Sequence, residues 1–283
     1  MGSSTRTIPW YFGTRGARPT HPELLDWLAT EFMQAGWSMK AMHRLMVTSA
    51  TYRQSSHIPA DLRERDPTNE LWARGPRFRL EAEMIRDVVL AASGQLFRTM
   101  SGPSVFPFQP EGIWNQPYYQ DYHWATSEGC DGYRRGLYTF WRRTTPYPSF
   151  MNFDASSREF CNVRRIRTNS PLQALTALND LAFFDAAKGL AKRILVEAAP
   201  SDEARATYGF RLCVSRYPKP KELDQLLNLY HQQLQHFQQD PQAGAKIMEG
   251  VILPAKGADP SEFSAWTVVS NLLLNMDETL TKE

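Results

Sequence analysis

SFMNFDASSREFCNVRRIRTNSPLQALTALND, residues 149–180, is the stretch from which the organisation of this chain is best understood. Its first half is a loop bounded by proline and aromatic residues, and positions 154–167 hold four arginines, an aspartate, a glutamate and a cysteine. Its second half predicts a helix, because Ser170 suits the N-cap, Pro171 the first helical position and Gln173 a capping box. A charged loop joined to a well-capped helix is a reasonable place for a functional site.

The bulk composition is that of an ordinary globular protein. The 283 residues are 42% hydrophobic and 22% charged, and the formal net charge is +2. The small net charge argues against a nucleic-acid partner, because a polyanion normally meets a strongly basic surface. No apolar run approaches the ~20 residues that span a bilayer, so we expect no transmembrane segment. The N-terminus shows no signal peptide.

The three cysteines, Cys130, Cys161 and Cys213, form no CxxC motif. The usual zinc spacings and the CxxCH motif of covalently bound haem are therefore missing, and we expect neither a metal nor a cofactor in this chain. One disulfide remains possible. Because Cys161 lies among arginines, it is either an activated thiol or a buried structural cysteine, and burial is the favoured interpretation.

Apolar periodicity predicts a mainly α fold, a helical bundle with an irregular, aromatic- and proline-rich insertion that contains short β strands. We expect an irregular and truncated arm at 1–20 and a single mainly helical domain at 21–283. Ser38 and Ser201 are expected to cap helices. The predicted helices are a hairpin at 22–36 and 38–52 and a single helix at 80–97. A C-terminal bundle is expected within 170–283, with helices at 171–195, 201–215, 220–237 and 261–276. The first of these four helices is expected to bend near Asn179, and a loop is expected before the last.

The insertion, residues 103–153, holds six prolines and fourteen aromatic residues. Proline argues against helix there, and alternation in RRGLYTFWRR, residues 134–143, favours short strands or extended pieces. The aromatic residues have two interpretations. They could form the walls of a site for sugars or other flat ligands, with Trp114 and Trp141 as candidates, or they close a loop-rich subdomain by packing.

Arginine carries every fixed positive charge between Lys40 and Lys188. Because a guanidinium group binds carboxylates, phosphates and sulfates in a planar fork, these arginines are candidates for an anionic ligand. The alternative is a hub of internal ion pairs that locks the loop to neighbouring helices. The candidate ligand-binding residues are Arg142, Arg143, Arg158, Arg164, Arg165, Arg167 and Asn169, together with Trp114 and Trp141.

Asp154 and Glu159 are the candidates for catalysis, since two carboxylates held by arginines would suit a nucleophile or an ion-pair brace. Glu83 and Asp87, one helical turn apart, could bind a metal, but an ion-pair face is favoured because Arg86 lies beside them. GxSxG, HExxH, P-loop and dinucleotide motifs are all missing. Whether the chain is an enzyme is left undecided.

Six ordered blocks resemble planctomycete-specific domain one, a family of unknown function numbered fifteen-fifty-three. They are THPELLDWLATEF (20–32), LMVTSATYRQS (45–55), RGPRFRLEAEMIRD (74–87), GPSVFPFQPEGIW (102–114), the stretch from RRGLYTFWRR to ALND (134–180) and AWTVVSNLLLNMDETLTKE (265–283). The resemblance implies the C-terminal module of exported, periplasmic or extracellular proteins, behind related domains that often include a cytochrome c-like domain carrying haem c. The first dozen residues differ from the family's lead-in, so we expect a fragment.

Three functions therefore stay open. The leading one is an accessory or ligand-binding module for a carbohydrate-like or anionic ligand, such as a polysaccharide, or for the upstream domains of the same family. The second is a hydrolytic or redox enzyme that uses Asp154, Glu159 and the arginines. The third is a purely structural scaffold.

Overall fold

The computed structural model describes residues 18–113, 123–162, 165–249 and 259–282. The chain divides into two compact units. The described part of unit 1 is residues 18–78 with Asn162 and Lys282, and unit 2 comprises the rest of the described chain. Within these ranges there are twelve α-helices and one two-stranded sheet, in which β1 (Phe78–Arg79) pairs with β2 (Thr281–Lys282). The predicted mainly α class is confirmed. The prediction of a single domain at 21–283 stays a prediction.

Unit 1 contains the predicted helical hairpin, α1 (Pro22–Gln34) and α2 (Met39–Thr48), followed by α3 (Ala60–Arg65). Ser38 caps α2 as predicted, since its Oγ accepts the N–H of Ala41 at 3.3 Å. Gly36 has φ of 64°, a left-handed conformation that suits glycine just beyond a helix end. None of the three helices contains a buried residue.

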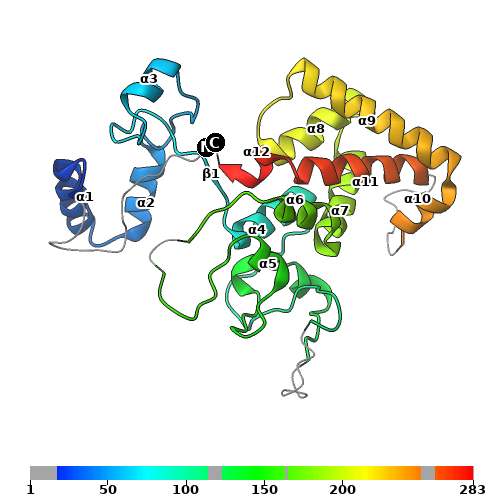
Figure 1. Cartoon of the computed structure of the whole chain (residues 1–283), viewed down its shortest axis with the longest axis horizontal. Coiled ribbons are helices and arrows are strands. Elements are labelled where there is room, and N and C mark those ends of the chain that lie inside the picture. Colours follow the sequence, from blue (N-terminus) through cyan, green and yellow to red (C-terminus); the bar gives the residue numbers. More distant parts are fainter. Residues whose placement is uncertain (1–17, 114–122, 163–164, 250–258, 283) are drawn as a thin grey trace. The chain divides into compact units, whose positions relative to one another are not determined.

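Unit 2 is a helical assembly with most of the buried core. Its central helix is α11 (Pro260–Leu274), which packs against α7 (Leu181–Glu197) and α9 (Pro220–Gln239). Figure 1 shows α11 in red among the yellow and green helices. Trp266, Phe263 and Leu273 of α11 are fully buried. The other helices are α4 (Ala82–Ser93), α5 (Pro148–Asn152), α6 (Pro171–Asn179), α8 (Asp202–Val214), α10 (Pro241–Ile247) and α12 (Asp277–Leu280).

The ends of several helices differ from their predictions. Ser170 is the N-cap of α6 but makes no side-chain bond there, and Gln173 turns inward to Asp154 and Thr168, so the predicted capping box is wrong. The predicted bend near Asn179 is a break, at which Asp180 caps α7 by accepting the N–H of Ala182 at 2.8 Å. Asp240 caps α10 inside the predicted loop, because its side chain accepts two backbone N–H groups.

The insertion, residues 103–153, is shaped by turns and by packing against α4. Of the short strands or extended pieces expected at 134–143, the structure has extended backbone with isolated bridges, such as Val105 with Thr139, while Gly136–Tyr138 form a 3-10 turn. The reason is a close approach to α4. A Cβ on Gly136 would lie 2.7 Å from the Glu83 carbonyl oxygen, and the Gly136 N–H donates to Asp87 at 2.6 Å. The backbone therefore bends onto a helix.

Aromatic rings fill the insertion. Trp124 stacks on Tyr147 with ring centroids 5.8 Å apart, and Tyr147 meets Phe150 edge to face at 5.2 Å. Tyr147 and Phe150 are also buried. For these rings the structure favours the packing interpretation over a ligand-binding wall.

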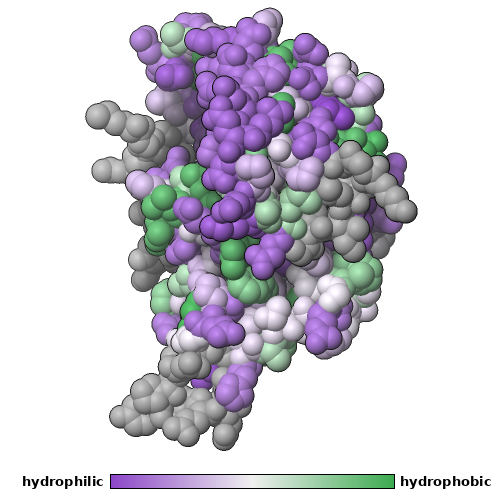
Figure 2. Space-filling model, turned by 90° about the vertical axis from the view of Figure 1, so that its right-hand side faces the viewer, coloured by the Kyte–Doolittle hydropathy of each residue, from purple (hydrophilic) through white to green (hydrophobic). Residues whose placement is uncertain are grey.

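The outer surface is largely polar on the side drawn in Figure 2, where hydrophilic side chains surround smaller apolar patches. Such a mixture is normal for a globular protein. None of the helices in the described ranges combines the length and hydropathy of a membrane-spanning segment.

Candidate functional site

Asp154 closes the charged loop onto α6. Its carboxylate accepts the backbone N–H of Thr168 at 2.6 Å and the Thr168 hydroxyl at 2.8 Å. It also accepts the side-chain amide of Gln173 at 3.2 Å. Asp154 and Arg158 have left-handed backbones with φ of 60° and 61°, a conformation that costs free energy in residues other than glycine. The hydrogen bonds to Asp154 hold the loop in this conformation.

Arg165 joins the loop to the first turn of α4. Its guanidinium donates to both carboxylate oxygens of Glu83, at 2.6 and 3.1 Å, and lies 3.5 Å from Glu81. Arg167 lies 3.9 Å from Glu81. Burial by itself would raise the pKa of Glu83, but the hydrogen bonds and charge of Arg165 outweigh it, and the pKa lies below its usual value. The two arginines thus form a hub of ion pairs.

A shallow hollow lies beside this hub. Arg79 donates to the Asn169 side chain at 3.2 Å and lies over the ring of Phe153 at 5.8 Å. The hollow has a volume of about 10 Å³, which is barely enough for one water molecule. Its lining residues are Arg79, Leu80, Glu81, Phe153, Asp154, Arg165, Ile166 and Arg167. In this conformation it has no room for a sugar ring.

The remaining candidates lie in several places. Arg158 is exposed and lies 5.0 Å over the ring of Trp141, while Arg143 is exposed and Arg142 half-buried. Glu159 is exposed on the loop, whereas the Asp154 carboxylate is occupied by Thr168 and Gln173. Trp114 and Arg164 lie outside the described residues.

Cys161 is exposed, so the favoured interpretation of a buried structural cysteine is wrong. The irregular loop turns the neighbouring Phe160 outward as well. Cys130 is exposed, Cys213 is buried, and all three thiols are free.

Glu83 and Asp87 share a helical face, and each binds an arginine from a different segment. Glu83 binds Arg165, and Asp87 accepts from Arg135 Nε at 2.8 Å. The ion-pair interpretation of this face is confirmed. The arginines that form the pairs are Arg165 and Arg135, whereas the sequence spacing had suggested Arg86. Across the described parts of the chain, no group of three or more His, Cys, Asp or Glu side chains is placed to hold a metal ion.

Four residues of the site were not predicted from sequence: Arg79, Glu81, Thr168 and Gln173. The available signal was the charge alternation of RFRLEAE, residues 77–83, which places arginines next to glutamates at a helix start. Thr168 and Gln173 gave no such signal, because their partner Asp154 lies across an irregular loop.

The fold and this cluster define a mainly helical protein whose charged loop is locked by ion pairs and hydrogen bonds. The family model described as PSD1, protein of unknown function (DUF1553), matches residues 5–230, and the chain belongs to this family. The family resemblance of the sequence is therefore confirmed. No curated protein and no solved structure matches the chain.

Proposed function

We propose that this chain is an accessory module that docks on a partner domain through the apolar face of unit 1. The observation that carries the proposal is the helical pair α1 and α2, which contains no buried residue. Trp27 of α1 is 47% exposed, Met39 of α2 is 59% exposed, and Trp37 in the turn between them is 65% exposed. Short helices gain most of their stability from packing an apolar face, and neither α1 nor α2 contains a buried residue. Tryptophan and methionine are also enriched where proteins meet.

The partner that we propose is an upstream domain of proteins in the same family. The family resemblance implies such domains, and α1 and α2 are the first described helices of the chain. An apolar face of this kind calls for an apolar, helix-sized groove on the partner, as in other helix-in-groove contacts.

The test measures binding of the full chain to a purified upstream domain of a family protein by calorimetry. We expect Trp27→Ser to weaken binding about tenfold or more, because buried tryptophans dominate such interfaces. The matched control is Leu175→Ser on α6, an apolar residue that is 54% exposed in unit 2 and should leave binding unchanged. Absence of binding by the unaltered chain, or equal losses in both variants, would refute the proposal.

A second candidate function is binding of an anionic polysaccharide beside the charged loop. Arg158 over Trp141, with exposed Arg143 on the adjoining segment, is a pairing of cation and ring that suits a sulfated sugar. Calorimetry against neutral and sulfated polysaccharides tests it. Binding of the sulfated form that Arg158→Ala abolishes would support this candidate, and equal heats from both polymers would exclude it.

The enzymatic alternative centres on Asp154 and Glu159. Asp154→Asn removes the negative charge but keeps a side-chain oxygen that can accept from Thr168. The variant therefore distinguishes a catalytic role of the carboxylate from its role in holding the loop. Full retention of any activity found in the parent protein would remove Asp154 from consideration as a catalytic residue. Export to the periplasm or cell exterior, beside a haem c-bearing domain, is likewise a proposal that rests on the family resemblance, and cell fractionation tests it.

A further inference from the structure

Helix α6 turns polar side chains inward and leucines outward. Gln173 and Thr176 are 0% and 9% exposed, whereas Leu172 and Leu175 are each 54% exposed. Leu178, one turn after Leu175, is exposed as well. A surface helix of a globular protein normally has the opposite arrangement, with its apolar stripe toward the core. The orientation of α6 is therefore inverted.

Hydrogen bonds fix this orientation from the inner side of α6. The side-chain amide of Gln173 donates to Asp154 at 3.2 Å and to the Thr168 hydroxyl at 3.0 Å. The side-chain amide of Asn152, on α5, donates to the Thr176 hydroxyl at 2.9 Å. Rotating the helix to bury its leucines would break these bonds and leave buried polar groups without partners, which costs free energy. The leucines therefore stay on the outer side.

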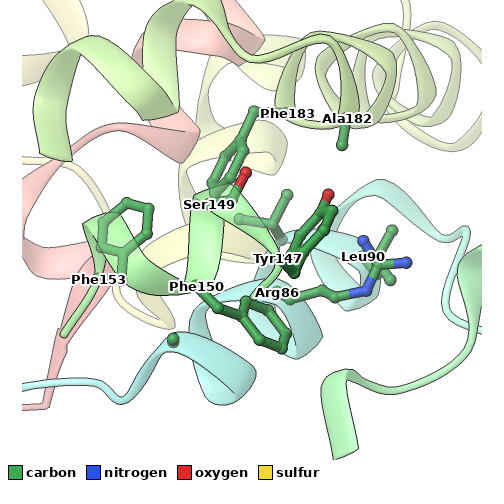
Figure 3. A pocket seen from close by; sticks show the side chains of 10 residues that line it. Arg86, Leu90, Tyr147, Ser149, Phe150, Phe153, Ala182 and Phe183 are labelled. Carbon is green, nitrogen blue, oxygen red and sulfur yellow. The ribbon is translucent and has the colours of Figure 1, made fainter. Parts of the chain in front are cut away.

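The neighbouring core also has no space for these leucines. Helices α5 and α7 both contact α6, and Figure 3 shows the place where they meet, with Tyr147, Phe150 and Phe183 around a cavity. The cavity has a volume of about 20 Å³, which is enough for roughly one water molecule. A leucine side chain does not fit into it. The outward position of the α6 leucines is thus a property of the packed fold.

Two leucines from other helices extend this surface. Leu181, at the start of α7, is exposed three positions after Leu178. The side-chain amide of Asn271, on α11, donates to the Leu178 carbonyl oxygen at 3.0 Å, and the next residue, Leu272, is exposed. Exposed apolar groups that gather in this way mark interaction sites. The leucine face, as we call it, consists of Leu172, Leu175, Leu178, Leu181 and Leu272.

The segments that carry the leucine face are uncharged. Residues 171–179 contain no Asp, Glu, Lys or Arg, and neither do residues 263–276. Asp180, between α6 and α7, accepts from the Ser149 hydroxyl and from the Ala182 N–H. A charged partner would lose hydration on this face without gaining an ion pair. The complementary surface must therefore be apolar and uncharged, and a second copy of the leucine face meets both requirements.

We propose that the leucine face is a self-association surface, at which two copies of this chain pair about a two-fold axis. Two-fold pairs are the commonest symmetric assemblies, and in them the same patch serves both partners. Leu175 lies at the middle of the α6 row and therefore faces the axis. Five leucines are fewer than the roughly 20–30 residues per side of a standard interface, so the pairing is weak and reversible.

The experiment measures the mass of the full chain by sedimentation equilibrium between about 1 and 200 µM. We expect a monomer–dimer equilibrium with a Kd between about 1 and 100 µM. Leu175→Glu should raise the Kd at least about tenfold, because it brings two negative charges together in an apolar contact. A chain that stays monomeric over the whole range would overturn the proposal and assign the face to a different protein.

Two control variants separate the leucine face from other apolar surfaces. Val196→Glu introduces the same charge at a residue of α7 that is 59% exposed, and its Kd should equal that of the unaltered chain. Trp27→Ser, which alters the face of unit 1, should also leave the Kd unchanged. Equal weakening by Leu175→Glu and either control would refute a specific pairing through α6.

The two-fold geometry has its own test. Leu175→Glu and Leu175→Lys should each be monomeric alone, because like charges meet at the axis. An equimolar mixture should form a heterodimer, since opposite charges then face each other. Both variants should keep the circular dichroism of the unaltered chain, because the side chain at 175 lies at the surface. A mixture that stays monomeric while the unaltered chain dimerises would contradict the face-to-face arrangement.

Hydrogen exchange gives a readout on the unaltered chain. At a concentration well above the Kd, exchange of the amides in residues 172–181 should be slower than in a sample diluted below it. The amides of α1 and α2 should exchange at the same rate in both samples. Slowing that is confined to α1 and α2 would overturn the proposal.

Discussion

Arg216 binds two carboxylates from opposite sides. It donates to both oxygens of Glu222 at 2.8 Å and to both oxygens of Glu278 at 2.8 and 2.9 Å. The side chain therefore joins the end of α8 to the start of α9 and to α12. Because the pairing is bidentate on each side, it is stronger than an ordinary surface ion pair.

We predict that Arg216→Met lowers the free energy of unfolding by about 1 kcal/mol near neutral pH. Hydrogen bonds from Arg216 lower the pKa of Glu222 from 4.5 to about 2. A carboxyl group with a lowered folded-state pKa stabilises the protein above its unfolded pKa, and this stabilisation is lost as pH falls through the folded value. Urea unfolding of the unaltered chain and of Arg216→Met should therefore give free energies of unfolding that differ at pH 7, and this difference should shrink below about pH 4. A difference that is constant with pH would contradict this account.

The three cysteines differ in burial. Burial raises the pKa of the Cys213 thiol to about 12, and the charge of Arg193 opposes this only in part. Cys130 and Cys161 are exposed. Because the thiolate is the reactive form, we predict that Ellman's reagent modifies Cys130 and Cys161 in the native chain and reaches Cys213 only after unfolding. Single Cys→Ser variants assign each reaction. Rapid native modification of Cys213 would show that the core opens more readily than its packing indicates.

At the scale of single residues, the charged residues that form ion pairs could be picked out from the sequence, but which of them pair with each other could not. The sequence placed Arg165 and Glu83 among the charged candidates, yet 82 positions separate them and only the folded chain brings them together. Gln173 had the spacing of a capping box, but its side-chain amide donates to the partly buried Asp154 carboxylate instead. Cys161 looked buried by residue type, and an irregular loop exposes it.

At the scale of elements, two helical glycines have opposite surroundings. A Cβ on Gly209 of α8 would lie 2.7 Å from Ile194 Cδ1 and 3.2 Å from Leu273 Cδ1, both of them fully buried side chains. A Cβ on Gly244 of α10 would find its nearest atom at 3.5 Å, an ordinary contact. The close packing of α8 on α7 and α11 therefore depends on a missing side chain.

We predict that Gly209→Ala lowers the free energy of unfolding by about 1–3 kcal/mol through overpacking, although alanine favours helix. Gly244→Ala serves as the control and should raise it by about 0.5–1 kcal/mol, because alanine loses less backbone entropy. Chemical denaturation measures both changes. Stabilisation by both substitutions would mean that the core at Gly209 has room to adjust.

Helices with strong periodicity were predictable, and irregular segments were not. Helices α4, α7, α8, α9 and α11 follow runs of apolar residues at helical spacing. Helix α10 was missed because glycine and proline suggested a loop, although Pro241 occupies a first-turn position that tolerates proline. Alternation at 134–143 suggested short strands or extended pieces, but close contacts with Glu83 and Asp87 accompany a 3-10 turn at Gly136–Tyr138.

At the scale of the whole molecule, the helices of the two units differ in how many buried residues they contain. The three helices of unit 1 hold no buried residue, whereas α7 and α11 contain many side chains with no exposed surface. Local stability follows buried apolar contacts. Unit 1 should therefore open far more often than unit 2.

We predict that the backbone amides of α1 and α2 exchange hydrogen at least about 100-fold faster than those of α7 and α11. Hydrogen exchange read by mass spectrometry measures this difference. If the upstream domain binds unit 1 as proposed, its addition should slow exchange in α1 and α2 alone. Equal protection of both units in the isolated chain would contradict the prediction.

The position of α11 in the chain has a consequence for synthesis on the ribosome. Helices α7 and α9 bury their apolar faces against α11, which begins at Pro260, after both of them. A growing chain that has reached only α9 or α10 lacks that surface, and its apolar faces stay in contact with water. Unit 2 therefore completes its folding only after α11 has been synthesised, and until then the nascent chain presents binding sites for chaperones.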